Sequence, residues 1–246
     1  MDSVFSLNGK TILITGATSG IGKTCVVKFA QSGAKIVAVG RDAQKLEKLK
    51  SEVPNISVVE ADLSDINSYN FISQIPEING AFFCAGISID EKPLKFLDDK
   101  TIIQTVNTNL LSNIMMTREL LKYRKLNRGG SIVYAASVSG MLGRPQSSIY
   151  GTTKAGLIYF VKNMAVELAP RKCRVNTISP GMVETPMTID FIKNSPELYS
   201  TDLKKHPLGY GKPEYIANLV QFLLSDASSW ITGTNIPIDG GFSCQK

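Results

Sequence analysis

The stretch that decides the fold is Lys10-Thr11-Ile12-Leu13-Ile14-Thr15-Gly16-Ala17-Thr18-Ser19-Gly20-Ile21-Gly22. Its first six residues form a short apolar run with β-branched side chains, which predicts a buried strand. A glycine-rich turn follows at once, and apolar residues at helical spacing come after the turn. A strand, a glycine-rich turn and a helix in this order are the context that a dinucleotide-binding site requires.

Each glycine of the turn has an expected task. Gly16 allows a tight turn, Gly20 lets the backbone approach a pyrophosphate, and Gly22 lets the helix pack close to the strand. The anion would then lie at the N-terminus of the helix. Three residues separate Gly16 from Gly20, so the common G-x-G-x-x-G pattern does not match, and a plain strand-to-helix turn is the alternative.

A second pattern, Tyr150-Gly151-Thr152-Thr153-Lys154, predicts acid–base chemistry. A spacing of four residues puts Tyr150 and Lys154 on one face of a helix. The pKa of a free tyrosine is about 10, and a fixed ammonium nearby lowers it toward a value useful for general acid catalysis. The alternative for an isolated pair is a tyrosine that lies across a helix surface.

Thr15-Gly16-x-x-x-Gly20-x-Gly22 and Tyr150-x-x-x-Lys154 together resemble the short-chain dehydrogenase/reductase family. Ser137, thirteen residues before Tyr150, and Asn109 match the remaining catalytic positions of that family. The resemblance extends over nearly the whole chain through three further segments, Pro180–Thr185, Ile231–Gly233 and Ile238–Gly241.

The expected fold is α/β, because strand-like runs alternate with helical ones and no linker or repeat interrupts the chain. Beyond the first strand, the expected strands are Lys35–Val39, Ile56–Glu60, Gly80–Cys84, Ser131–Ala135, Arg174–Ile178 and Asn235–Ile238. The resemblance implies a single doubly wound Rossmann domain over residues 1–246, with a seven-stranded parallel sheet in the order 3-2-1-4-5-6-7 and helices on both faces. Ligands of such folds bind at the carboxyl ends of the strands.

The end of the second strand predicts the cofactor. NAD enzymes carry an acidic residue there, but this position corresponds to Gly40 and is followed by Arg41. A guanidinium suits the 2′-phosphate of NADP(H), which is the cofactor we expect. An ordinary surface charge is the alternative for Arg41, and Asp42 is expected to cap the next helix.

The resemblance also implies the remaining cofactor contacts. Asp62 and Leu63 match the pair that contacts the adenine, and Phe83-Cys84-Ala85-Gly86 stands where the family usually has Asn-Asn-Ala-Gly. The amides that brace the central sheet are therefore missing. The full expected set is Gly16, Thr18, Ser19, Gly20, Ile21, Gly22, Arg41, Asp62, Leu63, Ala85, Gly86, Tyr150, Lys154, Pro180, Gly181, Val183 and Thr185.

The implied reaction is hydride transfer from NADPH to a ketone with general acid catalysis. In this scheme Tyr150 donates the proton, Ser137 hydrogen-bonds the carbonyl oxygen, Lys154 holds the nicotinamide ribose, and Asn109 anchors a water in a proton relay. No metal site is expected. We expect the only histidine, His206, to be a solvated loop residue.

Substrate contacts are expected from an apolar pocket under a lid at about residues 185–210. The expected contacts are Ser137, Met141, Gln146, Met182 and Met187, with Leu142 nearby. For Met141 and Met182, ordinary core packing is an equal alternative, since methionine often fills cores.

Charge suggests a partner. The net charge is +6 and the pI about 9.1. Arg128 and Arg171 match positions where 3-oxoacyl-acyl-carrier-protein reductases carry arginines that dock the acidic carrier. The leading hypothesis is therefore a reductase of 3-oxoacyl thioesters on acyl carrier protein. A reductase of another ketone, sugar or secondary metabolite and a non-catalytic NADP-binding regulator are the alternatives.

Other features narrow the setting of the protein. Nucleic acid binding is not expected because no recognition motif accompanies the positive charge. No apolar stretch is long enough to span a bilayer, and the N-terminus lacks the features of a signal peptide. Four scattered cysteines predict reduced thiols in a cytoplasmic protein, with Cys25, Cys84 and Cys173 in the core.

The helical stretches predict assembly. Leu97–Lys125 and Ile149–Ala169 carry apolar residues on more than one face, which favours a helix-pair interface, and the family resemblance implies a homotetramer. The examples from the first stretch are Leu110, Leu111, Ile114, Met115, Leu120 and Leu121.

Overall fold

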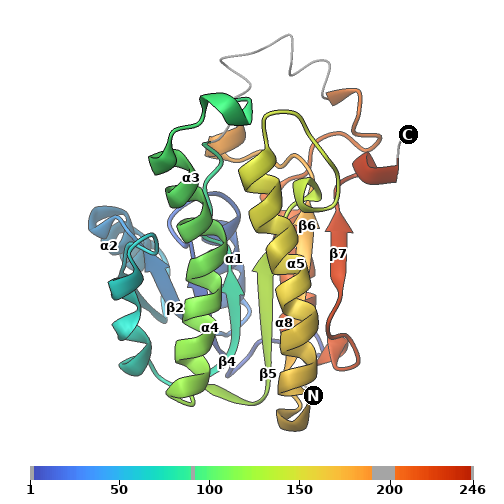
Figure 1. Cartoon of the computed structure of the whole chain (residues 1–246). Coiled ribbons are helices and arrows are strands. Elements are labelled where there is room, and N and C mark those ends of the chain that lie inside the picture. Colours follow the sequence, from blue (N-terminus) through green and yellow to red (C-terminus); the bar gives the residue numbers. More distant parts are fainter. Residues whose placement is uncertain (1–2, 90–91, 190–202, 245–246) are drawn as a thin grey trace.

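The computed structural model describes residues 3–89, 92–189 and 203–244. Seven parallel strands form one sheet in the order β3-β2-β1-β4-β5-β6-β7 (Figure 1), as the family resemblance implied. The strands are β1 (Thr11–Thr15), β2 (Lys35–Gly40), β3 (Ile56–Glu60), β4 (Ile78–Phe83), β5 (Leu126–Ala135), β6 (Arg174–Pro180) and β7 (Asn235–Ile238). The predicted strands lie within two residues of these bounds, except that β5 begins five residues earlier.

Helices cover both faces of the sheet (Figure 1). On one face lie α3 (Asp99–Val106), α4 (Ser112–Lys122) and α5 (Ser148–Leu168), and on the other lie α1 (Gly20–Gln31), α2 (Ala43–Glu52) and α8 (Pro213–Leu224). Strand alternation divides the core between the faces: Leu13 packs with the α4 and α5 side, whereas Ile12 and Ile14 pack with the α1 and α8 side. In the part of the chain that the structure describes, no helix has the length and apolar character that crossing a membrane demands.

Two aspartates begin helices as N-caps. The Asp42 carboxylate accepts a hydrogen bond from the Lys45 amide at 3.0 Å, at the start of α2. Asp98 does the same for the Thr101 amide at the start of α3, at 2.7 Å. A capped amide is no longer without a partner, which stabilises the first turn. The capping role expected of Asp42 is thus confirmed.

One long helical segment replaces the predicted helix over 97–125. It consists of α3, a π-helical turn (Asn107–Leu111) and α4, joined end to end. π-helical turns are rare and often mark functional sites. Asn109 lies within this turn and is fully buried.

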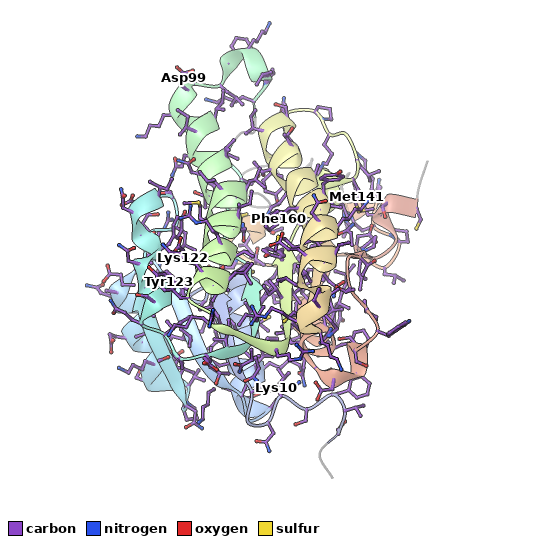
Figure 2. All side chains as sticks on the ribbon, turned by 60° about the horizontal axis from the view of Figure 1, so that its bottom comes forward. Lys10, Asp99, Lys122, Tyr123, Met141 and Phe160 are labelled. Atoms are coloured by element: carbon purple, nitrogen blue, oxygen red, sulfur yellow. The ribbon has the colours of Figure 1, made fainter. Side chains whose placement is uncertain are left out.

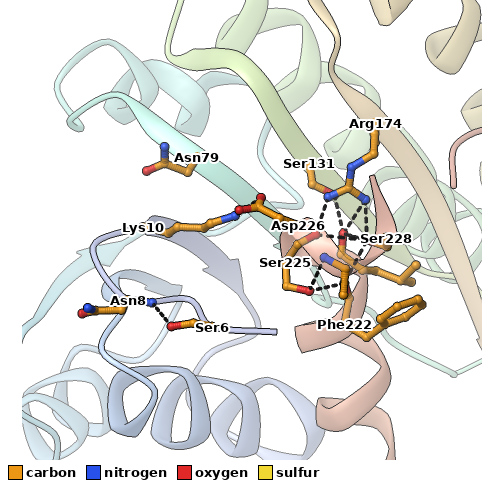
Figure 3. A network of polar contacts seen from close by, with 12 residues as sticks. Ser6, Asn8, Lys10, Asn79, Ser131, Arg174, Phe222, Ser225, Asp226 and Ser228 are labelled. Atoms are coloured by element: carbon orange, nitrogen blue, oxygen red, sulfur yellow. Dashed lines mark hydrogen bonds and ion pairs between the residues drawn. The ribbon is translucent and has the colours of Figure 1, made fainter. Parts of the chain in front are cut away.

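The amino-terminal edge of the sheet is closed by a buried arginine (Figure 3). The Arg174 guanidinium, at the start of β6, donates to the carbonyl oxygens of Leu223 and Ser225 and to the hydroxyl of Ser228. The two carbonyl groups lie at the C-terminal end of α8 (Pro213–Leu224), where carbonyl groups have no partner within the helix. Arg174 therefore joins the last helix to the sheet.

Candidate active site

The glycine turn fits a dinucleotide. Gly16 has a φ of +64°, which only glycine adopts readily, and a Cβ on Gly22 would lie 2.2 Å from the Gly16 carbonyl oxygen. Side chains at these positions would therefore prevent α1 from approaching β1. The Ser19 side chain makes no capping hydrogen bond with α1, so the first amides of this helix are not occupied by a side-chain cap. A helix N-terminus of this kind suits a pyrophosphate.

A cleft of about 440 Å³ lies at the carboxyl ends of the strands. Tyr150, in the first turn of α5, lines it together with Lys154 one turn later and Ser137, which follows β5. The predicted catalytic Ser, Tyr and Lys thus face a single cleft. Of the predicted cofactor and substrate residues, those that also line it are Gly16, Ser19, Gly20, Ile21, Gly22, Ala85, Gly86, Gln146, Pro180, Gly181, Met182, Val183, Thr185 and Met187.

Lys154 is buried, and its ammonium donates a hydrogen bond to the carbonyl oxygen of Ala135 at 2.7 Å. The same nitrogen lies 5.5 Å from the centre of the Tyr150 ring. Burial lowers the pKa of Lys154 to about 8, because removal from water disfavours the charged form. The carbonyl at the end of β5 therefore holds a cation beside the tyrosine.

Ser137 begins a short 3-10 turn (Val138–Gly140), and its hydroxyl oxygen accepts a hydrogen bond from the Ser139 amide at 3.1 Å. An oxygen that accepts this bond keeps its own proton for donation. The hydroxyl can thus donate to a substrate oxygen in the cleft.

Asn109 does not line the cleft but braces its wall. Its side chain accepts from the Ile87 amide and donates to the Ile87 carbonyl oxygen, each at 2.8 Å. Its own carbonyl oxygen accepts from the Asn113 side chain at 2.8 Å. Since Gly86 and Ile87 line the cleft, Asn109 fixes the position of that wall.

The unusual Phe83-Cys84 pair has two separate environments. Phe83 is buried, and its ring centre lies 5.1 Å from that of Tyr134, so it fills the core. Cys84 was predicted to be in the core but is half-buried and lines the cleft. Burial raises the pKa of its thiol to about 12, which keeps it neutral. Thr15 braces this strand end, because its hydroxyl accepts from the Cys84 and Ala85 amides at 3.0 and 3.1 Å.

The expected adenosine end lies beyond β2 and β3. Arg41 is exposed, and its charge contributes to lowering the pKa of Asp62, although hydrogen bonds from Ser64 are the larger cause. A Cβ on Gly40 would lie 3.0 Å from the Thr18 methyl group. Position 40, where NAD enzymes carry an acid, is therefore crowded in this chain. Leu63 is buried, and its carbonyl oxygen accepts from the Tyr69 hydroxyl.

Two predicted locations are wrong. Met141, labelled in Figure 2, and Leu142 are exposed and do not line the cleft. The Met141 sulfur accepts a hydrogen bond from the Asn235 side chain on β7 at 3.1 Å. The chain turns away from the cleft at residues 141–143 and borders it again at residues 144–147. His206 is not solvated but buried, with its ring stacked on Phe242 at 4.7 Å. A local sequence pattern carries no signal for such an aromatic contact, because Phe242 is distant from His206 in the sequence.

The predicted carrier-docking arginines lie far from the cleft of their own chain. Arg128 is exposed near the start of β5, and Arg171 follows α5 just before β6. Both therefore lie at the amino-terminal edge of the sheet, whereas the cleft lies at the carboxyl edge. The Arg171 guanidinium also donates to the Leu126 carbonyl oxygen. The central part of the predicted lid, residues 190–202, lies outside the described residues.

A charged side chain that the sequence analysis did not assign also lines the cleft. Arg144, in the loop between Ser137 and Tyr150, lines the cleft. Its position between Ser137 and Tyr150 in the sequence was the signal that could have placed it near the cleft. Among the residues that the structure describes, no group of three or more His, Cys, Asp or Glu side chains is arranged to hold a metal ion.

The comparisons with known proteins agree with this geometry. Residues 16–243 match a family model described as enoyl-(acyl carrier protein) reductase. The chain is 37% identical over 245 residues to the 3-oxoacyl-[acyl-carrier-protein] reductase of Thermotoga maritima, covering 96% of this chain and 98% of that relative. It is also 31% identical over 252 residues to a tropinone reductase homologue of Arabidopsis thaliana, covering 98% and 95% of the two chains.

Solved structures show the same likeness. A 4-hydroxyisoleucine dehydrogenase complexed with NADH has a TM-score of 0.89 and 32% identity, over 97% of this chain and 100% of that one. A putative short-chain alcohol dehydrogenase from Sinorhizobium meliloti 1021 has a TM-score of 0.91 and 27% identity, over 99% and 100%.

Fold and site together define an oxidoreductase that acts on CH–OH groups with NAD(P)(H). The chain belongs to the short-chain dehydrogenase/reductase family.

Proposed function

We propose that this protein uses NADPH to reduce a 3-oxoacyl thioester carried on acyl carrier protein, and that it does so in the cytoplasm. The observation that carries the proposal is the convergence of Ser137, Tyr150 and Lys154 on one cleft. Support for the acyl substrate comes from the 37% identity with a relative named as such a reductase.

A nicotinamide held in this cleft would supply the hydride that reduces the ketone carbon. The Ser137 hydroxyl donates a hydrogen bond to the carbonyl oxygen and stabilises the charge that develops on it. Tyr150 gives its proton to this oxygen as the alkoxide forms. Lys154, fixed by the Ala135 carbonyl, places a positive charge beside the tyrosine and favours release of that proton.

Preference for NADPH over NADH is supported by the end of β2. Arg41 is exposed there and can form paired hydrogen bonds with a 2′-phosphate. Crowding of Gly40 against Thr18 leaves little room for the acid that would bind two ribose hydroxyls. Asp62 lies close enough to Arg41 to respond to its charge, so the two side chains border the same region.

Carrier docking on Arg128 and Arg171 requires a second copy of the chain. α5 rises about 27 Å between Tyr150 and Leu168, so both arginines are remote from the cleft of their own chain. A twofold axis across α5 would set the C-terminal end of one helix beside the N-terminal end of its partner. We therefore propose a homotetramer in which the carrier docks on one chain and delivers its bound substrate to the cleft of a neighbouring chain.

The first test is turnover of an acetoacetyl thioester with NADPH, measured by loss of nicotinamide absorbance. Tyr150→Phe should lower kcat on the order of a hundredfold or more, while the Kd of NADPH changes little, because only a proton donor is lost. Wild-type turnover in this variant would remove Tyr150 from the mechanism. Binding of NADPH without turnover of any ketone by the unmodified protein would favour a regulator.

The second test concerns the carrier. Arg128→Glu should raise KM for the carrier-bound substrate, with a smaller effect at high salt, because exposed charges are screened. A pantetheine thioester makes no carrier contact and serves as the control substrate. Arg171 is left unchanged because it holds the Leu126 carbonyl. Equal KM changes for both substrates would argue against docking at Arg128.

A further inference from the structure

Within the described parts of the chain, two charged side chains line the cleft, and both are positive. Lys154 and Arg144 are its charged residues, and no aspartate or glutamate lines it within the described parts of the chain. Lys154 is already engaged beside Tyr150 through the Ala135 carbonyl. Arg144 is exposed and has no part in the proton transfer described above. A guanidinium at the mouth of a cleft favours the approach of anions.

The chain path puts Arg144 on the substrate side of the cleft. It stands between Ser137 and Tyr150, the two residues that contact the reacting oxygen in the proposed reaction. The cofactor side is built instead by the turn between β1 and α1. Gln146, two residues after Arg144, lines the same cleft and has a positive φ of 61°, so the backbone here is held in an uncommon conformation.

An aromatic platform supports the Arg144 side chain. The guanidinium carbon lies 5.9 Å from the centre of the Phe242 ring, within cation–π range. Phe242 stacks on His206, with ring centres 4.7 Å apart, and His206 meets the edge of Tyr210 at 4.9 Å. His206 and Tyr210 are both buried. The platform therefore rests on the core and not on mobile surface groups.

The aromatic platform also contacts Met182, a residue after β6 that lines the cleft. The Met182 amide lies 3.5 Å from Nε2 of His206, and Met182 lines the cleft. The guanidinium of Arg144 is planar, and its five N–H donors allow more than one partner at a time. Such a group is suited to carboxylate and phosphate oxygens.

We propose that Arg144 is a specificity residue that binds an anionic group of the substrate, a carboxylate or a phosphate. This inference rests on the proposed reductase function and narrows its substrate class. Two sources supply such an anion: the phosphate of a phosphopantetheine arm, or the carboxylate of a small keto acid. Phe242 is the positioning residue that holds Arg144 at the cleft.

The test compares two matched pairs of ketones with the full-length protein and NADPH. Acetoacetyl-phosphopantetheine and acetoacetyl-pantetheine differ in the phosphate, and acetoacetate and ethyl acetoacetate differ in the carboxylate. Arg144→Gln should raise KM roughly 10- to 100-fold for the charged member of one pair and leave KM of its neutral partner within about twofold. The affected pair identifies the source of the anion.

Three further variants separate charge recognition from damage. Arg144→Lys should recover part of the affinity, since it restores the charge but not the paired donors. Phe242→Leu should give the same pattern more weakly. Lys50→Gln, a loss of one exposed charge on α2, should change no KM. Equal changes for charged and neutral ketones, or no change with either pair, would overturn the role of Arg144.

Calorimetric binding of the same four compounds keeps this inference apart from the proposed function. Charge-dependent binding that is lost in Arg144→Gln, without turnover of any compound, would retain the anion site and reject the reductase. Turnover with identical kinetics in Arg144→Gln and the unmodified protein would retain the reductase and reject the anion site. Neither binding nor turnover of any compound would overturn both.

Discussion

The Asn109 side chain forms two hydrogen bonds with a single residue, Ile87, one to its amide and one to its carbonyl oxygen. The pair joins the π-helical turn between α3 and α4 to the segment that follows β4. Because Ile87 lines the cleft, a residue outside the cleft controls the shape of its wall.

Asn109→Ala should therefore impair catalysis without touching a reacting atom. It leaves both backbone groups of Ile87 without these partners, which costs about 2 kcal/mol of unfolding free energy, and it should lower kcat at least about tenfold. Asn109→Asp retains an acceptor for the Ile87 amide, so its stability and kcat should lie between those of the unmodified protein and Asn109→Ala. Urea unfolding and steady-state kinetics measure the effects. Wild-type kcat in Asn109→Ala would show that the wall does not depend on this pair.

The lowered pKa of Lys154 predicts how stability depends on pH. Its folded pKa of about 8 is below the ordinary value of 10.5, so between these values the unfolded chain binds more protons than the folded chain. The free energy of unfolding of the cofactor-free protein should therefore rise with pH across this window, by up to about 3 kcal/mol from this group. Lys154→Met should lack the rise. Urea unfolding at pH 7 and pH 9.5 tests this, and parallel pH curves for the two proteins would contradict it.

Cofactor preference should depend on Arg41. Arg41→Ala is expected to weaken NADPH binding roughly 10- to 100-fold and to leave NADH binding nearly unchanged, because a charged hydrogen bond to the 2′-phosphate is lost. Fluorescence titration of both cofactors decides the matter, with Lys50→Ala as the charge-matched control. Gly40→Asp alone should bind both cofactors poorly, since its side chain meets Thr18, and adding Thr18→Ala should recover NADH binding. Equal losses of affinity for NADPH and NADH in Arg41→Ala would show that Arg41 does not bind the 2′-phosphate.

The two cations near the C-terminal end of α8 should differ in their effect on stability. Arg174→Met leaves buried carbonyl groups of α8 without donors and should lower the free energy of unfolding by about 3 kcal/mol. Lys10→Met breaks a partly exposed ion pair with Asp226 and should cost less than about 1 kcal/mol. Chemical denaturation of both variants gives the comparison. Similar losses of unfolding free energy in the two variants would mean that the buried Arg174 network stabilises the fold no more than the Lys10–Asp226 ion pair.

Assembly should depend on the exposed face of α5. Tyr159 and Val166 are 66% and 76% exposed on this helix, whereas Leu120, one of the apolar examples from the first helical stretch, is fully buried in the core. Light scattering at micromolar concentration should give the mass of four chains. Val166→Glu should shift it to smaller species while circular dichroism stays unchanged. A monomeric unmodified protein would contradict the tetramer, and with it carrier docking across chains.

Local patterns predicted much of this structure. The strand, glycine turn and helix at residues 10–31 depend on neighbours in the sequence, and Tyr150 and Lys154 share a helix face by their spacing alone. The sheet order required the family resemblance, because spacing says nothing about which strands pair. The burial of His206 and the position of Arg144 over Phe242 depend on contacts between distant segments, which periodicity does not encode.

The distance of Arg128 and Arg171 from the cleft illustrates a similar limit. A match to family positions does not tell whether a proposed docking residue lies near the cleft of its own chain or near that of another copy. The positions of both arginines on one edge of the sheet follow only from the direction of β5 and α5.

The π-helical turn at Asn107–Leu111 also sets a helical phase. A π turn contains about one residue more than an α turn, and each residue of an α-helix advances the side chains by about 100°. Deleting one residue here would merge α3 and α4 into an uninterrupted α-helix and rotate the faces of α3 relative to α4 by that angle. The extra residue is thus a rotational offset, which lets the apolar face of α4 meet the sheet while Asn109 turns toward Ile87.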